Sequence, residues 1–141
     1  MAEKRQILIT GANGGIGLAL VRAVALAGYS VAAHYHRSAE KLSALADELC
    51  AQGAEVRLLQ FDVTDRAACK AALEKDIADN GVYYGVVSNA GICSDVAFPA
   101  MTDADWDNVL DTNLNGFYNV LRPLVMPMCR KKMGGRIVVV S

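Results

Sequence analysis

Glycines at the junction of two predicted elements are the residues of this chain best placed to do chemistry. The stretch Thr10-Gly11-Ala12-Asn13-Gly14-Gly15-Ile16-Gly17 joins an apolar segment, residues 6–10, to an amphipathic helical pattern. A helix N-terminus offers unpaired N–H groups and about +0.5 of an elementary charge, and glycines let an anion approach the backbone. The motif lacks the Lys-Ser/Thr pair of NTPase loops, so the alternatives are an ordinary turn or a dinucleotide site. We predict a cradle for a dinucleotide's diphosphate, contacted by Gly11, Asn13, Gly14, Gly15, Ile16 and Gly17.

The elements that must position this turn alternate between extended and helical patterns. We expect strands over residues 6–10, 30–35, 55–61, 84–88 and 136–140. We expect helices over residues 15–27, 38–51, 64–80 and 102–132, with Ser38 and Thr64 capping the second and third, and with Pro123 and Pro127 bending or interrupting the last. This order predicts an α/β fold, a doubly wound parallel sheet of the Rossmann type. Its ligand should lie at the carboxyl edge, where the strand order reverses.

The last predicted strand bears on the extent of the domain. Residues 136–140 are almost purely Ile and Val, and native proteins normally cover an apolar strand at a sheet edge. We therefore expect residues 1–141 to form a dinucleotide-binding domain that is cut at its fifth strand and lacks a C-terminal part.

Composition narrows the class of protein. With 141 residues, 53% of them hydrophobic and 21% charged, the chain can bury the core of one soluble domain. A net charge of −1 gives no general attraction to nucleic acid. We find neither a signal peptide nor an uncharged apolar run of the ~20 residues that span a bilayer, and we predict a cytoplasmic protein without membrane contact.

Thiols and imidazoles are the candidate metal ligands. The four cysteines lie far apart in the sequence, and we expect them to be reduced thiols. His34 and His36, two apart on a strand, would face the same side and could form a metal pair. No third ligand accompanies them, so we predict no metal site.

Several motifs together resemble one known family. The glycine turn, Asp62-Val63, Asn89-Ala90-Gly91 and Thr112-Asn113 have the types and spacing of the short-chain dehydrogenase/reductases, across the whole chain. Within the family the chain is most similar to 3-oxoacyl-acyl-carrier-protein reductases. The stretches Val86 to Gly91 and Ala97 to Ala100 resemble the branch found in aryl polyene pathways, although Ser88 replaces the commoner Asn.

The resemblance implies roles for individual residues. Asp62 would hydrogen-bond the adenine amino group and Val63 would contact the ring, while Asn89, Ala90 and Gly91 would lie along the ribose and the central sheet. The alternatives from position alone are a helix cap for Asp62 and an ordinary turn for Asn89.

The resemblance also implies a catalytic group. Asn113 would be catalytic, because in relatives this Asn helps hold a water that links a catalytic Lys to a proton relay. Ser141 would be the first of a Ser-Ser pair whose second member is catalytic, and a register shift of one residue would make Ser141 itself catalytic. The family's Tyr-x-x-x-Lys pair would come about a dozen residues later, and no tyrosine here is followed by lysine four positions on.

The end of the second strand bears on the choice of cofactor. NAD-binding folds place an Asp or Glu about 20 residues after the glycine turn, whereas this chain has Tyr35-His36-Arg37-Ser38. Arg37 and Ser38 can donate to a 2′-phosphate, and His36 would neighbour the adenosine ribose, so we predict NADPH. Gly14 argues against this, because many NADPH-using relatives carry a basic residue there. The alternative for Arg37 is a solvated loop charge.

The predicted function is NADPH-dependent reduction of a 3-oxoacyl thioester on acyl carrier protein, in fatty-acid or polyene-like biosynthesis. We expect residues 1–141 alone to be inactive. One alternative is a reductase of another ketone, a sugar or a steroid. A second, which applies if 141 residues is the true length, is a non-catalytic nucleotide-binding module.

Two surface patterns bear on partners. The basic residues Arg130, Lys131, Lys132 and Arg136 would steer an acidic acyl carrier protein to a patch near the cleft, or are a solvated helix end. A homo-oligomer, a tetramer by resemblance, would form through the apolar residues Phe117, Val120, Leu121, Leu124, Val125 and Met128.

Overall fold

The computed structural model describes residues 3–141 and contains one five-stranded parallel sheet. The strands are β1 (Gln6–Ile9), β2 (Ser30–Tyr35), β3 (Val56–Gln60), β4 (Gly85–Ser88) and β5 (Arg136–Val139). Their order is β3-β2-β1-β4-β5, so the order reverses between β1 and β4. The predicted doubly wound fold is confirmed.

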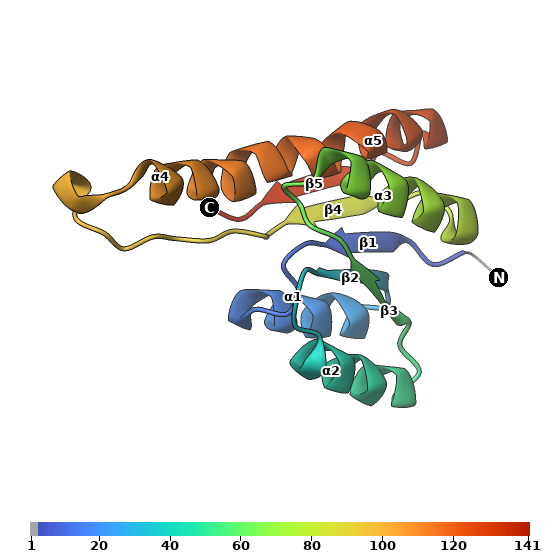
Figure 1. Ribbon diagram of the computed structural model, residues 1–141. Helices are drawn as coiled ribbons and strands as arrows, with labels where there is room; N and C mark the ends of the chain where they lie inside the picture. Colours follow the sequence, from blue (N-terminus) through green and yellow to red (C-terminus); the bar gives the residue numbers. More distant parts are fainter. Residues whose placement is uncertain (1–2) are drawn as a thin grey trace.

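Helices cover both faces of this sheet (Figure 1). α1 (Gly15–Leu26) and α2 (Glu40–Ala51) lie on one face, and α3 (Arg66–Asn80) and α5 (Gly116–Lys131) lie on the other. Because both faces are covered, neighbouring strand residues enter opposite cores: Leu8 packs on the α3 and α5 side, and Ile7 and Ile9 pack on the α1 and α2 side. The alternation fixes the register of β1, since a slip of one residue would exchange the two faces.

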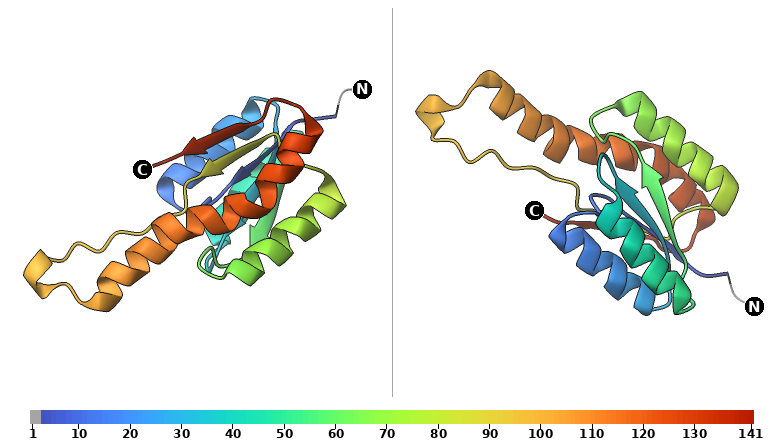
Figure 2. Two further views of the ribbon diagram at one scale, coloured as in Figure 1. Left: turned by 90° about the horizontal axis from the view of Figure 1, so that it is seen from above. Right: turned by 60° about the horizontal axis from the view of Figure 1, so that its bottom comes forward.

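The region predicted as one helix over residues 102–132 consists of three joined segments. α4 (Asp103–Leu110) begins with a capping box in which Thr102 and Asp105 each bond the other's backbone N–H. A π-helical segment, Asp111–Asn115, then connects α4 to α5. Figure 2 shows α4 and the loop before it, which holds a short 3₁₀ turn at Phe98–Ala100, projecting beyond the carboxyl edge of the sheet.

The two prolines of α5 do not interrupt it. Pro123 and Pro127 both lie inside this 16-residue helix. A proline in a helix interior removes a backbone hydrogen bond at a cost of about 3 kcal/mol. α5 nevertheless buries Val120, Leu121 and Leu124 against the core, and this packing overrides the local preference.

Two predicted helix caps are wrong. α2 begins at Glu40 after Ala39, without a side-chain cap, and the Ser38 carbonyl instead accepts a hydrogen bond from Asn13 Nδ2. α3 is capped by Asp65, whose carboxylate accepts from the N–H of Ala68 at 3.0 Å. Thr64 does not cap it, because its hydroxyl donates to Asp62 Oδ1 at 2.8 Å.

An ion pair at the amino edge of the sheet ties three elements together. Arg57 of β3 donates to both carboxylate oxygens of Asp76 on α3, at 2.8 and 2.6 Å, and also to Gln6 Oε1 of β1 at 2.7 Å. The Tyr83 hydroxyl donates to Asp76 as well. Burial opposes ionisation of Asp76, but the bonds from Arg57 and Tyr83 outweigh it and hold the pKa of Asp76 below its usual value.

The structure also shows the state of the cysteines and the exposure of the edge strand. All four cysteines, Cys50, Cys69, Cys93 and Cys129, are free thiols, as expected. Ile137, Val138 and Val139 of the edge strand β5 are 48%, 52% and 56% exposed. No helix formed by residues 3–141 is long and apolar enough to span a membrane.

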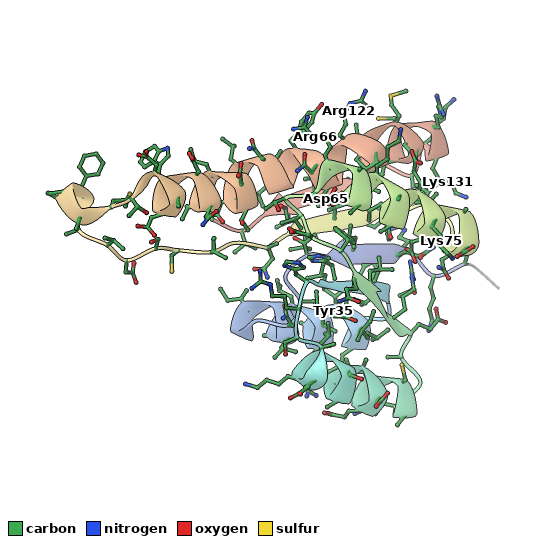
Figure 3. The ribbon with its side chains drawn as sticks, in the orientation of Figure 1. Tyr35, Asp65, Arg66, Lys75, Arg122 and Lys131 are labelled. Atoms are coloured by element: carbon green, nitrogen blue, oxygen red, sulfur yellow. The ribbon has the colours of Figure 1, made fainter. Side chains whose placement is uncertain are left out.

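Replacing Asp76 by Ala should destabilise the protein strongly, because it leaves the half-buried Arg57 without its counter-ion and the buried Tyr83 hydroxyl without its acceptor. We expect a loss of about 3 kcal/mol in the free energy of unfolding, measured by urea denaturation. The neighbouring Lys75 provides the control, since it forms an exposed ion pair with Asp79 on the outer face of α3 (Figure 3). Lys75→Ala should leave the urea midpoint unchanged, and equal losses in both variants would contradict this account of Asp76.

Candidate functional site

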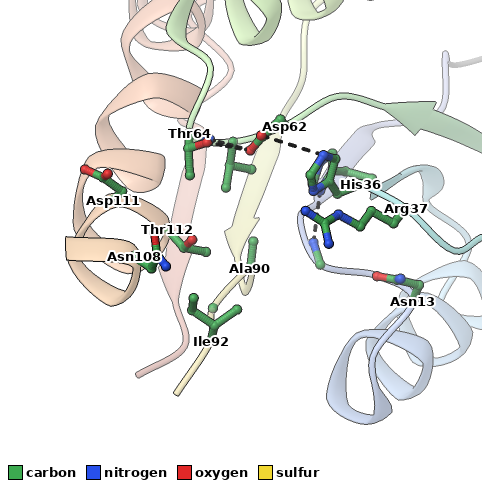
Figure 4. A pocket seen from close by; sticks show the side chains of 14 residues that line it. Asn13, His36, Arg37, Asp62, Thr64, Ala90, Ile92, Asn108, Asp111 and Thr112 are labelled. Carbon is green, nitrogen blue, oxygen red and sulfur yellow. Dashed lines mark hydrogen bonds and ion pairs between the residues drawn. The ribbon is translucent and has the colours of Figure 1, made fainter. Parts of the chain in front are cut away.

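A cleft of about 550 Å³ lies at the carboxyl edge of the sheet, over the reversal between β1 and β4 (Figure 4). Its walls come from the turns after β1, β2, β3 and β4 and from the junction of α4 with the π-helical segment. Eight of the predicted cofactor-binding residues line it: Gly11, Asn13, His36, Arg37, Asp62, Val63, Ala90 and Gly91. Parallel strands present their carboxyl ends at one edge, and for this reason residues far apart in sequence meet here.

The glycine turn is held tightly at one end and left open at the other. Gly11 has φ +61°, and a Cβ on it would lie 2.8 Å from Ala90 Cα. A Cβ on Gly17 would lie 2.2 Å from the Gly11 carbonyl oxygen, so helix α1 can approach the turn only with glycine at this position. A Cβ on Gly15 would meet nothing within 4 Å. Packing therefore explains Gly11 and Gly17 but leaves Gly15 unexplained.

The first turn of α1 presents free backbone donors beside Gly15. Gly14 is the N-cap residue of α1, and no side chain caps the helix there. The first N–H groups of a helix have no partner within the helix, so those of Gly15, Ile16 and Gly17 can donate to an anion. Gly14, Gly15 and Ile16 are all exposed, which leaves the approach to these donors open.

Thr10 joins the turns after β1 and β4, although our sequence analysis assigned it no role. Its buried hydroxyl accepts hydrogen bonds from the N–H groups of Asn89 and Ala90, both at 3.0 Å. The Asn89 side chain in turn donates to the Gly11 carbonyl at 3.2 Å. Asn89, predicted to contact cofactor, thus holds the glycine turn and does not line the cleft. In the sequence, the signal that could have revealed this role of Thr10 is a hydroxyl residue at the end of an apolar strand.

The end of β3 places an ionised carboxylate in the cleft. Asp62 Oδ1 accepts from the N–H and the hydroxyl of Thr64, at 2.9 and 2.8 Å, which is an Asx turn and not the helix cap considered above. Burial opposes ionisation, but these two bonds outweigh it and lower the pKa of Asp62 below its usual value. The other oxygen, Oδ2, lies 3.6 Å from His36 Nε2 and is free to accept from a ligand.

The turn after β2 supplies the cations of the cleft. Arg37 is exposed and extends into the cleft beside His36 (Figure 4). It forms no ion pair with any residue from 3 to 141. Ser38 lies next to it but outside the cleft lining, where its carbonyl accepts from Asn13 Nδ2 at 2.8 Å.

His34 and His36, two residues apart at the end of β2, both line the cleft but differ in burial. His36 follows the last residue of β2 and is exposed, whereas His34 is 2% exposed. His34 Nδ1 accepts from the Gly11 N–H at 3.1 Å, and Nε2 lies 2.7 Å from the Phe61 carbonyl oxygen. Within residues 3–141 no group of three His, Cys, Asp or Glu side chains could hold a metal ion. The sequence indicates His34 only as a possible metal ligand, so its hydrogen bonds to the turn after β1 and to the end of β3 were not predicted.

Asn113 lies in the π-helical segment and uses its whole side chain to hold the loop after β4. Its Oδ1 accepts from the N–H of Ile92 at 2.8 Å and its Nδ2 donates to the carbonyl of Ile92 at 2.9 Å. This bidentate pairing fixes Gly91 and Ile92 at the cleft wall. Asn113 does not itself line the cleft.

Ser141 follows β5 at the same carboxyl edge. The N–H of Val140 donates to the Ser88 carbonyl at 3.0 Å, which keeps the end of β5 paired with β4. Ser141 is exposed and lies outside the cleft lining. No hydrogen bond joins Asn113 to Ser141, both of which the structure describes.

Comparison with known proteins agrees with this geometry. A family model described as short chain dehydrogenase matches residues 5–141. The chain belongs to the short chain dehydrogenase family. Two curated relatives are named 3-oxoacyl-[acyl-carrier-protein] reductase FabG: that of Aggregatibacter actinomycetemcomitans is 48% identical over 96% of this chain, and that of Staphylococcus aureus strain Mu50 is 34% identical over 97%. The chain spans about half the length of these relatives, 56% in each case.

Solved structures of this family superpose closely on the chain. One, described as gox2181, has a TM-score of 0.90 and 30% identity, and covers 99% of this chain and 54% of its own. Another is a gluconate 5-dehydrogenase from Burkholderia cenocepacia J2315 in complex with NADP and tartrate. It has a TM-score of 0.88 and 32% identity, and covers 98% of this chain and 53% of its own.

The structure places two surfaces of this short chain dehydrogenase, the basic cluster and the apolar face, differently from the sequence prediction. Arg130, Lys131 and Lys132 lie at the C-terminal end of α5, and Arg136 begins β5, so this basic cluster sits at the amino edge (Figure 3, Lys131), opposite the cleft of the same chain. The apolar residues predicted for self-association mostly form the core. Val120, Leu121, Leu124 and Met128 are buried, Phe117 packs against them, and of the six only Val125 is classed as exposed.

The glycines of the turn should respond differently to a methyl group. Gly17→Ala should lower the free energy of unfolding by about 2 kcal/mol, because the new Cβ meets the backbone of Gly11 and Ala12. Gly15→Ala is the matched control, and its free energy of unfolding should stay within about 1 kcal/mol of the parent value. Urea denaturation measures the free energy of unfolding of both variants. A loss of about 2 kcal/mol in Gly15→Ala as well would mean that packing demands glycine at both positions.

Proposed function

We propose that this protein reduces a 3-oxoacyl thioester, carried on acyl carrier protein, to the 3-hydroxyacyl form with NADPH. The observation that carries the proposal is the uncapped start of α1 with open space at Gly15, at the edge where the strand order reverses. Such a helix end suits a diphosphate. The substrate class is supported by the relative that is 48% identical and named as a 3-oxoacyl-[acyl-carrier-protein] reductase, and the cofactor class by the relative solved with NADP.

Residues that line the cleft, together with the start of α1 just outside its lining, fit the parts of this cofactor. The amides of Gly15, Ile16 and Gly17 would hold the diphosphate, and Gly14 at the N-cap leaves the approach clear. At the adenosine end, Asp62 Oδ2 would accept from the adenine amino group and Val63 would contact the ring, while Ala90 and Gly91 would lie along the ribose.

The phosphate that distinguishes NADPH from NADH would meet the turn after β2. Among residues 3–141 Arg37 has no ion-pair partner to release before it donates to a 2′-phosphate, and His36 lies beside it in the cleft. Ser38 would contribute its hydroxyl from just outside the cleft lining. No carboxylate stands in this turn to repel a second negative charge.

The bound cofactor would supply a hydride to the keto carbon of the substrate. The chain's own contribution is to hold the cofactor and to fix the wall of the cleft, where Asn113 keeps Ile92 in place. Ser141 would orient the carbonyl or stand next to the serine that does. By resemblance to the family, a Tyr whose pKa is lowered by a neighbouring Lys would protonate the product, and no tyrosine of residues 1–141 is followed by lysine four positions on.

A second candidate is reduction of a different ketone or a sugar acid. The relative named gluconate 5-dehydrogenase, 32% identical, is the observation that favours it. Its identity to this chain is lower than that of the 48% relative, so we place the thioester first.

We also propose that the protein forms a homo-oligomer, through a different apolar stripe from the one predicted. Trp106, Leu110, Leu114 and Tyr118 follow one another at intervals of four along α4, the π-helical segment and α5, and are 53%, 39%, 61% and 49% exposed. Residues four apart share one helix face. A second copy of the chain could cover this stripe, and a tetramer remains our prediction.

The function is tested with the protein at its native length. Purified protein should oxidise NADPH when a 3-oxoacyl thioester on acyl carrier protein is added, followed by the loss of absorbance of the reduced nicotinamide. Gluconate-type keto acids and simple ketones serve as competing substrates. NADPH oxidation with keto acids alone would favour the second candidate, and failure to bind any nicotinamide nucleotide would reject both.

Arg37 should determine the preference for NADPH. Arg37→Glu replaces the donor by a carboxylate that repels the 2′-phosphate, so the dissociation constant of NADPH should rise by about 10- to 100-fold. The dissociation constant of NADH, which lacks this phosphate, should change less than about threefold. Lys41→Glu on α2 makes the same change of charge outside the cleft lining and should leave both constants unchanged. Calorimetry measures both dissociation constants. If Arg37→Glu binds NADPH as tightly as the parent protein, Arg37 is a solvated loop charge.

A further inference from the structure

His34 makes more connections between the turns of the cleft than its place in a strand requires. It lies one residue before the end of β2 and is 2% exposed. Its Nδ1 accepts from the N–H of Gly11, and its carbonyl accepts from the N–H of Ala12 at 2.8 Å. Its Nε2 reaches the carbonyl of Phe61, whose ring lies 4.1 Å from the imidazole. One residue therefore holds the turn after β1 and the end of β3.

The hydrogen bonds define which form of the imidazole is present. The Gly11 N–H can only donate, so Nδ1 must be an unprotonated acceptor. Nε2 then carries the proton and donates to the Phe61 carbonyl at 2.7 Å. Burial opposes charging of the ring and lowers the pKa of His34 to about 4, with His36 and Asp62 as the titratable groups nearby. The neutral form is thus the one that satisfies both neighbours.

The two backbone groups that His34 holds belong to the two ends of the cleft. Gly11 opens the glycine turn, and its carbonyl is fixed from the other side by Asn89. Phe61 directly precedes Asp62 and Val63, which line the adenosine end. Thr10 and Asn89 connect the turn only to β4, so among these contacts His34 alone connects it to β3.

We propose that His34 is a positioning residue for the cofactor: its Nδ1 holds the Gly11 N–H and so orients the diphosphate-binding turn, while the bond from Nε2 to Phe61 keeps the ring in the form whose Nδ1 can accept. The inference rests on the proposed use of a nicotinamide dinucleotide. A diphosphate bound at the start of α1 depends on the orientation of this turn. Loss of the bond to Gly11 frees the turn to rotate its amides away from the diphosphate.

Three substitutions separate the two bonds of the ring. In His34→Asn the amide oxygen can take the place of Nδ1 and accept from Gly11, but nothing reaches Phe61. In His34→Gln the longer amide can donate to Phe61, but no acceptor faces Gly11. His34→Leu fills the volume and makes neither bond. NADP+ serves as the probe because it is stable in acid, and its dissociation constant is measured by calorimetry on the protein at its native length.

We expect His34→Gln and His34→Leu to weaken NADP+ binding roughly tenfold, while His34→Asn stays within about threefold of the parent protein. In steady-state assays the KM for NADPH should rise in the first two with kcat little changed. Equal affinity in all four proteins, or equal losses in all three variants, would overturn the role of His34 but leave NADPH binding by the parent intact. A parent protein that fails to bind NADP+ would overturn this inference together with the proposed function.

A control separates positioning from loss of stability. Tyr83→Phe removes a buried hydrogen bond to Asp76 at the opposite edge of the sheet, so it should lower the urea midpoint without changing NADP+ affinity. If the His34 variants do not fold, nitrogen NMR of the parent protein still decides. An unprotonated Nδ1 and a protonated Nε2 support the assignment, and a proton on Nδ1 rejects it. Acidification to pH 4 should weaken NADP+ binding in the parent more than in His34→Asn, and equal acid losses would reject it.

Discussion

The turn after β1 is the constraint on which this structure depends, because it must be rigid where it meets the sheet and open where it meets a ligand. Gly11 is wedged against Ala90 and bonded through its N–H to His34 and through its carbonyl to Asn89. Gly17 brings α1 against the same carbonyl. The Gly11 N–H and carbonyl on the inner side of the turn are thus both bonded, whereas no hydrogen bond within residues 3–141 uses the N–H groups of Gly15, Ile16 and Gly17. A helix end so arranged is preorganised for an anion, since little has to move when one arrives.

The two edges of the sheet use charge in opposite ways. At the amino edge, Arg57 and Asp76 neutralise each other and lock β1, β3 and α3 together. At the carboxyl edge, Asp62 keeps one oxygen free and Arg37 has no ion-pair partner among residues 3–141. Stability is therefore concentrated where no ligand is expected, and unsatisfied charge is concentrated at the cleft.

The sequence predicted the fold well because its signals are local and repeated. Apolar runs marked all five strands, and the crossover rule for parallel strands led to their arrangement. The errors were also local in origin. Ser38 and Thr64 looked like caps by type, but Thr64 is drawn to the carboxylate of Asp62 and the helix cap passes to Asp65. Pro123 and Pro127 looked like breaks, but the buried face of α5 outweighs their lost bonds.

For the site, residue types at fixed spacing predicted the glycine turn, Asp62 and Arg37, because a phosphate or an adenine makes the same chemical demand wherever it binds. What the sequence by itself determined is thus the chemistry that is available at each strand end. Only the tertiary structure decided which of these residues line the cleft and which bond distant backbone groups: Asn89, Asn113 and His34 form hydrogen bonds to backbone groups 78, 21 and 23 residues away in the chain. Such pairings depend on where distant backbone groups come to lie after folding, and no local pattern of residues encodes that position.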